Sequence, residues 1–166
     1  RQLLEGHFPR TEYFGRSFMI KGKTVGVLGL GHIGKKVAAL VTAFGANVIY
    51  YDILRQPDQE EKYGYRFVDF DTLLEQSDIF TVHCPLNEET RGMIGFEQFK
   101  KMKPSAMLIN TARGPIVDEA AMIDALTTGK IATAGLDTYE HEPLPKDHPL
   151  LKLDNVVASA HAGGNT

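Results

Sequence analysis

The sequence predicts an α/β fold in which a doubly wound parallel sheet lies between two layers of helices. Short apolar runs typical of β-strands recur along the chain, and helical patterns separate most of them. Several runs are apolar almost throughout, as in strands that are covered on both faces. Strand–helix alternation with buried strands implies parallel pairing through right-handed crossovers. The expected strands are residues 24–28, 47–51, 65–68, 79–83, 107–110, 133–136 and 156–159.

The helices are predicted from apolar spacing and from residues that start or stop a helix. Residues 33–44 have an apolar stripe typical of a helix, and Gly45 is expected to terminate it. The members of this stripe are Val37, Leu40, Val41 and Phe44. Two shorter helices are expected at residues 72–76, with Asp71 as the N-cap, and at residues 119–128, with Asp118 as the N-cap.

The chain is predicted to form one domain behind a short leading segment. Residues 1–22 carry no regular strand pattern and contain glycines and a proline that interrupt regular structure. Residues 23–166 hold the alternating pattern, and their length suits one domain with a substantial core. The first residue is Arg1 rather than Met, which suggests a piece of a longer protein.

Composition narrows the functional classes. The chain has 166 residues, 43% hydrophobic and 23% charged, with a formal net charge of −3 and no extended Lys/Arg cluster. We therefore expect no nucleic-acid or anionic-membrane partner. Cys84 is the only cysteine, and no C-x-x-C or H-E-x-x-H spacing occurs, so neither an internal disulfide nor a metal site is expected. Without a long apolar run or a signal-peptide pattern, a cytoplasmic location is expected.

The segment Gly29-Leu30-Gly31-His32-Ile33-Gly34 is the strongest local motif. It follows the first expected strand and begins the first expected helix. In such a turn the first glycine permits the bend, the second lets the backbone approach a pyrophosphate, and the third packs the helix against its strand. The segment therefore predicts a Rossmann-type dinucleotide-binding turn.

The next strand ends in Asp52, where an acid is expected to accept hydrogen bonds from the ribose hydroxyls of a dinucleotide. Its negative charge would repel a 2′-phosphate, which favours NAD over NADP. Arg55, three residues later, leaves NADP open, because a guanidinium at this place can bind a 2′-phosphate.

Polar residues also follow three later strands, at the sheet edge where α/β proteins bind ligands. Arg113 follows residues 107–110, Asp137 follows 133–136 with Glu140 and Glu142 shortly after, and His161 follows the last strand. An arginine can hold a carboxylate through two parallel hydrogen bonds, and a carboxylate beside a histidine stabilises the imidazolium. Beside a bound NAD, this set of side chains indicates a hydride-transfer site.

Taken together, these motifs resemble the NAD-dependent D-isomer-specific 2-hydroxyacid dehydrogenases. The resemblance runs from about Gly22 to His161, in family order. It rests on Gly29–Gly34, on His83-Cys84-Pro85-Leu86 with Thr90, on Asn110-Thr111-Ala112-Arg113-Gly114 with Val117-Asp118-Glu119, on Leu136-Asp137 with Glu142-Pro143, and on His161.

The resemblance implies three catalytic residues. Arg113 would bind the carboxylate and carbonyl of a 2-oxo acid, His161 would exchange a proton with the carbonyl oxygen, and Glu142 would hold the imidazole protonated. Asp137 would bind the nicotinamide carboxamide. The cofactor-binding set is completed by Gly29, Gly31, His32, Ile33, Gly34, Asp52, His83, Cys84, Pro85, Thr90, Thr111, Ala112 and Gly163.

The resemblance also implies a substrate domain built from sequence on both sides of the nucleotide domain, of which this chain would hold little. The isolated chain is therefore expected to bind NAD and to turn over poorly. A homodimer formed largely by nucleotide domains is expected. The residue before His161 is Ala160, where the family commonly has proline.

Two other functions stay open from the sequence. Dinucleotide-sensing corepressors related to these enzymes can retain the same Arg, Glu and His. Formate and phosphite dehydrogenases share the architecture, with Arg113 holding a different anion. The particular 2-hydroxy acid is not indicated by the sequence.

Overall fold

The computed structural model describes residues 19–164, which contain one parallel sheet with the strand order β3-β2-β1-β4-β5-β6-β7. All neighbouring strands pair in parallel. The strands are β1 (Thr24–Leu28), β2 (Asn47–Tyr51), β3 (Arg66–Phe67), β4 (Ile79–Val82), β5 (Met107–Asn110), β6 (Thr133–Leu136) and β7 (Val156–Ala158). The expected doubly wound sheet is confirmed. The leading segment predicted for residues 1–22 lies mostly outside the described residues.

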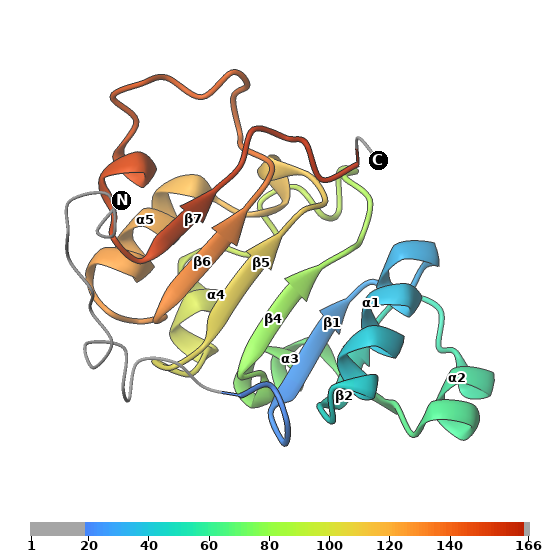
Figure 1. Ribbon diagram of the computed structural model, residues 1–166. Helices are drawn as coiled ribbons and strands as arrows, with labels where there is room; N and C mark the ends of the chain where they lie inside the picture. The colour runs from blue at the N-terminus through green and yellow to red at the C-terminus, as the bar shows by residue number, and fades with distance from the viewer. Residues whose placement is uncertain (1–18, 165–166) are drawn as a thin grey trace, which may run out of the picture.

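Helices cover the two faces of the sheet unequally (Figure 1). On one face, α1 packs over β1 and β2, with α2 beside it. On the other face, α3, α4 and α5 form a continuous layer. The helices are α1 (His32–Ala43), α2 (Pro57–Tyr63), α3 (Phe70–Gln76), α4 (Phe96–Lys101) and α5 (Glu119–Thr127), with short 3-10 turns η1 (Gly114–Ile116) and η2 (Pro149–Lys152).

The strands vary in how deeply they are buried. Four of the five residues of β1 are buried, as expected for a strand covered on both faces. In β5 and β6 burial alternates along the strand, and in β7 Val157 is 73% exposed. The expectation that strands are covered on both faces therefore holds near α1. It fails toward β7, because no described helix lies over this end of the sheet on the face that α1 covers.

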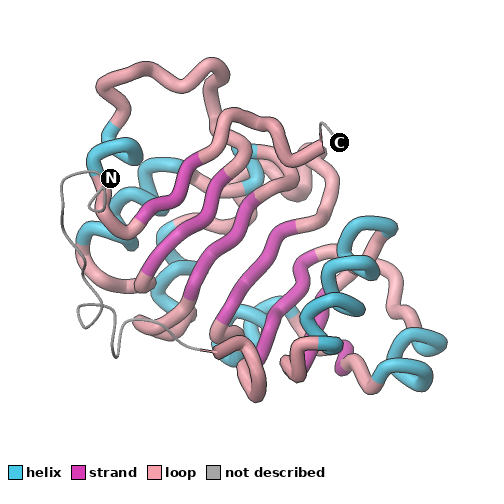
Figure 2. The backbone as a smooth tube through the Cα atoms, viewed as in Figure 1, coloured by secondary structure: helices cyan, strands magenta, loops and turns pink. Residues whose placement is uncertain are grey.

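The carboxyl ends of all the strands lie along one edge, where many of the loops gather (Figure 2). From β1 the chain adds β2 and β3 on one side and then returns to add β4 on the other side of β1. The order of the strands therefore changes direction between β1 and β4. Ligands of doubly wound sheets bind in the crevice outside such a switch point. The fold therefore places the glycine turn, which follows β1, beside the segment that follows β4.

Two details of the helices differ from the sequence prediction. The N-cap of α3 is Asp69, whose side chain accepts a hydrogen bond from Thr72 N at 2.8 Å, and not Asp71, which lies inside the first turn. The predicted stripe on the first helix is only half correct. Val37 and Val41 are partly buried, whereas Leu40 and Phe44 are 62% and 68% exposed, because Gly34 and Ala38 form the tight contact with the sheet.

Candidate NAD-binding and catalytic site

The glycine turn has the close packing that its three glycines predict. Gly29 has a φ of +90°, and a Cβ there would lie 2.6 Å from Cys84 N. A Cβ on Gly34 would lie 2.1 Å from Gly29 O, so only glycine lets α1 meet the turn. A Cβ on Gly31 would meet nothing within 4 Å. The turn is thus tight toward the protein and open where α1 begins, with His32 as its first residue.

Asp52 lies directly after β2 and faces this turn. Its Oδ2 accepts a hydrogen bond from Leu30 N at 2.7 Å, and its Oδ1 accepts one from Leu54 N at 3.0 Å. The carboxylate is therefore fixed against the glycine turn by backbone donors. Lone pairs remain on both oxygens for ribose hydroxyls, because a carboxylate has about four acceptor sites.

The segment after β4 forms the opposite wall of the crevice. His83, Cys84 and Pro85 line two neighbouring hollows. The first, of about 150 Å³, also includes Gly29, Gly31, Asp52 and Thr90, and the second, of about 580 Å³, also includes His32, Ile33, Thr111, Ala112 and Arg113. These two hollows bring together most of the predicted cofactor residues.

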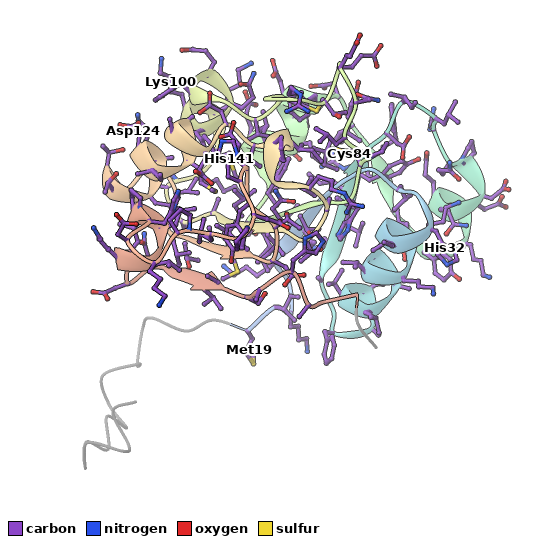
Figure 3. The ribbon with its side chains drawn as sticks, turned by 90° about the horizontal axis from the view of Figure 1, so that it is seen from above. Met19, His32, Cys84, Lys100, Asp124 and His141 are labelled. Atoms are coloured by element: carbon purple, nitrogen blue, oxygen red, sulfur yellow. The ribbon has the colours of Figure 1, made fainter. Side chains whose placement is uncertain are left out.

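Side chains in this wall are held by local contacts and by burial. Thr90 Oγ1 donates to Pro85 O at 2.7 Å and accepts from Asn87 N at 2.8 Å, which closes the turn 85–90. Burial lowers the pKa of His83 and raises the pKa of the Cys84 thiol to about 11. Both groups are thus held in their uncharged forms at neutral pH. Figure 3 places Cys84 over the middle of the molecule, with His32 at α1.

Arg113 is presented by a turn that a buried asparagine organises. Asn110, 1% exposed at the end of β5, donates from Nδ2 to Arg113 O at 3.0 Å and accepts from Ala112 N at 3.1 Å. Arg113 itself is exposed, and its Nη1 donates to Ala112 O at 2.6 Å. Among residues 19–164, no carboxylate lies within 4.0 Å of its guanidinium. Its charge is therefore available to an anion.

Glu142 and His161 form a direct pair. Glu142 Oε2 lies 2.7 Å from His161 Nδ1, and Glu142 Oε1 accepts from Tyr139 N at 3.0 Å. The hydrogen bond to His161, followed by the one from Tyr139, lowers the pKa of Glu142. His161 has a φ of +52°, in the left-handed region that residues other than glycine seldom adopt. Both residues line a hollow of about 620 Å³ beside β7.

Asp137 holds the segment that carries His161. Its Oδ1 accepts from Ser159 Oγ at 2.6 Å and from Ala162 N at 3.0 Å, and its Oδ2 accepts from Gly163 N at 2.9 Å. These three donors lower the pKa of Asp137. Figure 1 shows this segment crossing from β7 back over the carboxyl edge of the sheet.

Sequence reasoning assigned no role to several residues that shape the site. Gly114 lies against the backbone of Tyr139, because a Cβ there would be 2.0 Å from Tyr139 C. The Arg113 turn and the Glu142 loop are thereby packed together. Tyr139 Oη also donates to Ser159 O at 2.7 Å, which joins the Glu142 loop to the end of β7. For the Arg113 turn, the sequence did contain a signal: Asn110 is a polar residue at the end of an apolar strand.

These features fit a dinucleotide. The glycine turn packs so closely against Cys84 that no side chain fits at Gly29, whereas the space at Gly31, where α1 begins, is open. The Asp52 carboxylate is fixed at the end of β2. Among residues 19–164 there is no group of three or more His, Cys, Asp or Glu side chains that fits a metal ion. In the same range, no helix combines the length and hydropathy needed to cross a membrane.

Fold and site together define a Rossmann-type dinucleotide-binding domain. The chain belongs to the D-isomer specific 2-hydroxyacid dehydrogenases, and it is their NAD-binding domain: the model of that domain matches residues 1–163.

Individual sequence relatives agree with this assignment. The chain is 48% identical over 166 residues to D-3-phosphoglycerate dehydrogenase of Archaeoglobus fulgidus, covering 100% of this chain and 31% of the relative. It is 49% identical over 143 residues to glyoxylate reductase of Korarchaeum cryptofilum, covering 86% and 43%. The chain thus spans less than half the length of these relatives.

Among solved structures, D-lactate dehydrogenase with NAD+ from Lactobacillus jensenii superposes with a TM-score of 0.86 at 40% identity, covering 97% of this chain and 52% of that one. NAD-dependent formate dehydrogenase from Staphylococcus aureus in complex with NAD gives a TM-score of 0.91 at 32% identity, covering 100% and 49%.

Proposed function

We propose that the protein containing this domain transfers a hydride between NAD(H) and a 2-hydroxy or 2-oxo acid, with specificity for the D isomer. The observation that carries the proposal is the Glu142–His161 pair, with 2.7 Å between Oε2 and Nδ1. Reduction of an anionic ketone uses a proton donor and a cation for the carboxylate. The His161 imidazole is suited to the first role, and Arg113, which has no carboxylate partner within residues 19–164, is suited to the second.

The roles of the chain's residues follow from their chemistry. Arg113 binds the substrate carboxylate and polarises the carbonyl oxygen. His161 donates its proton from Nε2 to that oxygen during reduction and takes it back during oxidation, since Nδ1 faces Glu142. Glu142 orients the ring through its hydrogen bond with Nδ1. The nicotinamide of NAD(H) supplies or accepts the hydride.

The cofactor is held along the crevice between α1 and the segment after β4. The first turn of α1 offers N–H groups to the pyrophosphate, where the helix dipole also favours negative charge. Asp52 binds the adenosine ribose, and Asp137 binds the carboxamide while it fixes the His161 segment. The remaining contacts come from Gly29, Gly31, His32, Ile33, His83, Cys84, Pro85, Thr90, Thr111, Ala112 and Gly163. Gly34 contributes by letting α1 approach the turn closely.

The proposal extends to the assembly and its surroundings. A second domain, outside this chain, supplies further substrate contacts and closes the cleft, so this domain alone binds NADH and turns over poorly. The protein is a cytoplasmic homodimer that requires neither nucleic acid nor membrane as a partner. The exposed apolar side chains of α1, Leu40 and Phe44, support an interface at this helix.

The test is oxidation of NADH by the full-length protein with a panel of 2-oxo acids, beside a His161→Asn variant. Asparagine tolerates a positive φ and carries no ionisable group, so it removes the proton donor with the least strain. We expect turnover of at least one acid and a loss of about a hundredfold or more in kcat for the variant. NADH binding is expected to stay within about threefold of that of the unsubstituted protein.

Two other outcomes would contradict the proposal. Formate oxidation without 2-oxo acid reduction would favour a formate dehydrogenase, an alternative supported by the structural similarity to one. Tight NADH binding without turnover of any acid or formate would favour a cofactor-sensing module.

A further inference from the structure

We infer that Glu60 is a second determinant of cofactor choice: it holds Arg55 away from the adenosine ribose and so keeps the site selective for NAD. The inference rests on the proposed NAD-dependent function. Without Glu60, the guanidinium three residues after Asp52 is a ready binding group for the 2′-phosphate of NADP.

The contact between the two side chains is bidentate. Arg55 Nε donates to Glu60 Oε1 at 2.9 Å, and Arg55 Nη2 donates to Glu60 Oε2 at 2.7 Å. This geometry occupies one of the two edges of the guanidinium that can bind a phosphate in a bidentate manner. Arg55 also lies over the ring of Phe67, with its Cζ 5.8 Å from the ring centroid, which further fixes its direction.

Glu60 is itself anchored to the sheet. Tyr50 Oη, from a residue that is 0% exposed in β2, donates to Glu60 Oε1 at 2.7 Å and accepts from Gln56 N at 2.7 Å. The hydrogen bonds from Arg55 and then from Tyr50 lower the pKa of Glu60 to about 2. The carboxylate is therefore charged at neutral pH. Its side chain is 17% exposed, against 62% for Arg55.

The place of Glu60 in α2 gives an independent reason for this role. No residue of α2 is buried, so the helix adds little to the hydrophobic core. Its side-chain hydrogen bonds to the rest of the described chain run through Glu60, to Tyr50 on one side and Arg55 on the other. The helix thus brings a carboxylate to Tyr50 of β2 and to Arg55, which lies three residues after Asp52.

Asp52 and Glu60 then divide the selection between them. Asp52, fixed by Leu30 N and Leu54 N, provides repulsion toward a 2′-phosphate. Glu60 pairs with Arg55, the cation three residues after Asp52, which would otherwise offset this repulsion. Rejecting a competitor by an unfavourable charge while withholding a favourable one is a general route to specificity.

The experiment measures binding of ADP-ribose and of 2′-phospho-ADP-ribose by calorimetry, so that turnover plays no part. In the full-length protein, we expect Glu60→Gln to lower the Kd for 2′-phospho-ADP-ribose by about tenfold, which is the usual effect of one additional charged hydrogen bond. ADP-ribose affinity should change less than about twofold. The Arg55→Gln/Glu60→Gln double variant should return the ratio of the two affinities to that of the unsubstituted protein.

Glu61→Gln is the matched control, because Glu61 is the exposed neighbour and its loss changes the net charge equally. An affinity ratio in Glu60→Gln equal to that in Glu61→Gln would overturn the inference, as would a double variant that keeps the gain. If the unsubstituted protein binds neither ligand, the proposed NAD-dependent function fails as well. Normal ADP-ribose binding with an unchanged ratio refutes the role of Glu60 alone.

Discussion

Individual side chains of this site owe their chemistry to a few neighbours each. Asn110 shapes the turn before Arg113, Tyr139 fixes Glu142, and Asp137 holds the segment of His161. Asn110 and Asp137 act through side chains that bind the backbone of a loop, and Tyr139 acts through its backbone N–H, which donates to Glu142 Oε1. The loops therefore have little freedom, although they lie outside the regular elements.

Cys84 provides a prediction at this scale, because it lines the crevice but has a pKa of about 11, raised mainly by burial. Only the thiolate reacts with alkylating agents, so at pH 7.5 we expect Cys84 to react with iodoacetamide at least about a hundredfold more slowly than free cysteine. The rate should rise by about tenfold per pH unit through pH 9. Mass spectrometry of timed samples measures it.

Guanidinium-unfolded protein serves as the control for Cys84 and should react as fast as free cysteine. A rate in the folded protein that stops rising below pH 9 would show that the thiol is not held protonated by its surroundings.

At the scale of elements, sequence patterns predicted the strands better than the helices. The strands are short apolar runs bounded by polar residues, and their positions agree closely with the structure. Helix α2 gave no apolar signal, since none of its residues is buried, and the six-residue α4 is too short for a repeat. The sequence placed the cap at Asp71, two residues late, because Asp69 precedes an apolar residue, Phe70, that begins the helix.

The two aspartates near α3 give a test with its own control. Asp69→Ala removes the acceptor for Thr72 N, and we expect it to lower Tm by about 3 °C. Asp71 forms an exposed ion pair with Lys101 at 2.6 Å, a kind of contact that contributes little. Asp71→Ala should therefore change Tm by less than about 1 °C. Thermal unfolding followed by circular dichroism measures Tm. An equal decrease in Tm for the two variants would refute Asp69 as the N-cap of α3.

At the scale of the molecule, the sequence predicted which residues gather at one sheet edge, because topology alone brings the carboxyl ends of parallel strands together. It did not predict that Arg55 turns toward Glu60, since that depends on where a helix without buried residues comes to lie. Nor did it show that one face of the sheet is covered only near α1. Helix packing, rather than strand pattern, decides both.

The exposed stripe of α1 gives a prediction about assembly. Leu40→Asp places a charge where the proposed dimer buries an apolar side chain, and we expect the full-length protein to shift from dimer to monomer at about 10 μM. Light scattering coupled to size-exclusion chromatography measures the mass. Phe96→Asp, on α4 and 46% exposed, is the control and should remain dimeric. A dimeric Leu40→Asp variant, or a monomeric unsubstituted protein, would exclude α1 as the interface.

The position of β1 between β2 and β4 also has a consequence for synthesis on the ribosome. When β1, α1 and β2 have emerged, one edge of β1 is complete, but its other edge waits for β4, which starts only at Ile79. During that interval the nascent chain exposes the unpaired backbone N–H and C=O groups of β1, an apolar strand that is buried in the folded domain. An interior strand of the finished sheet is thus an open edge during translation, and chaperones that bind extended apolar segments would meet this protein there.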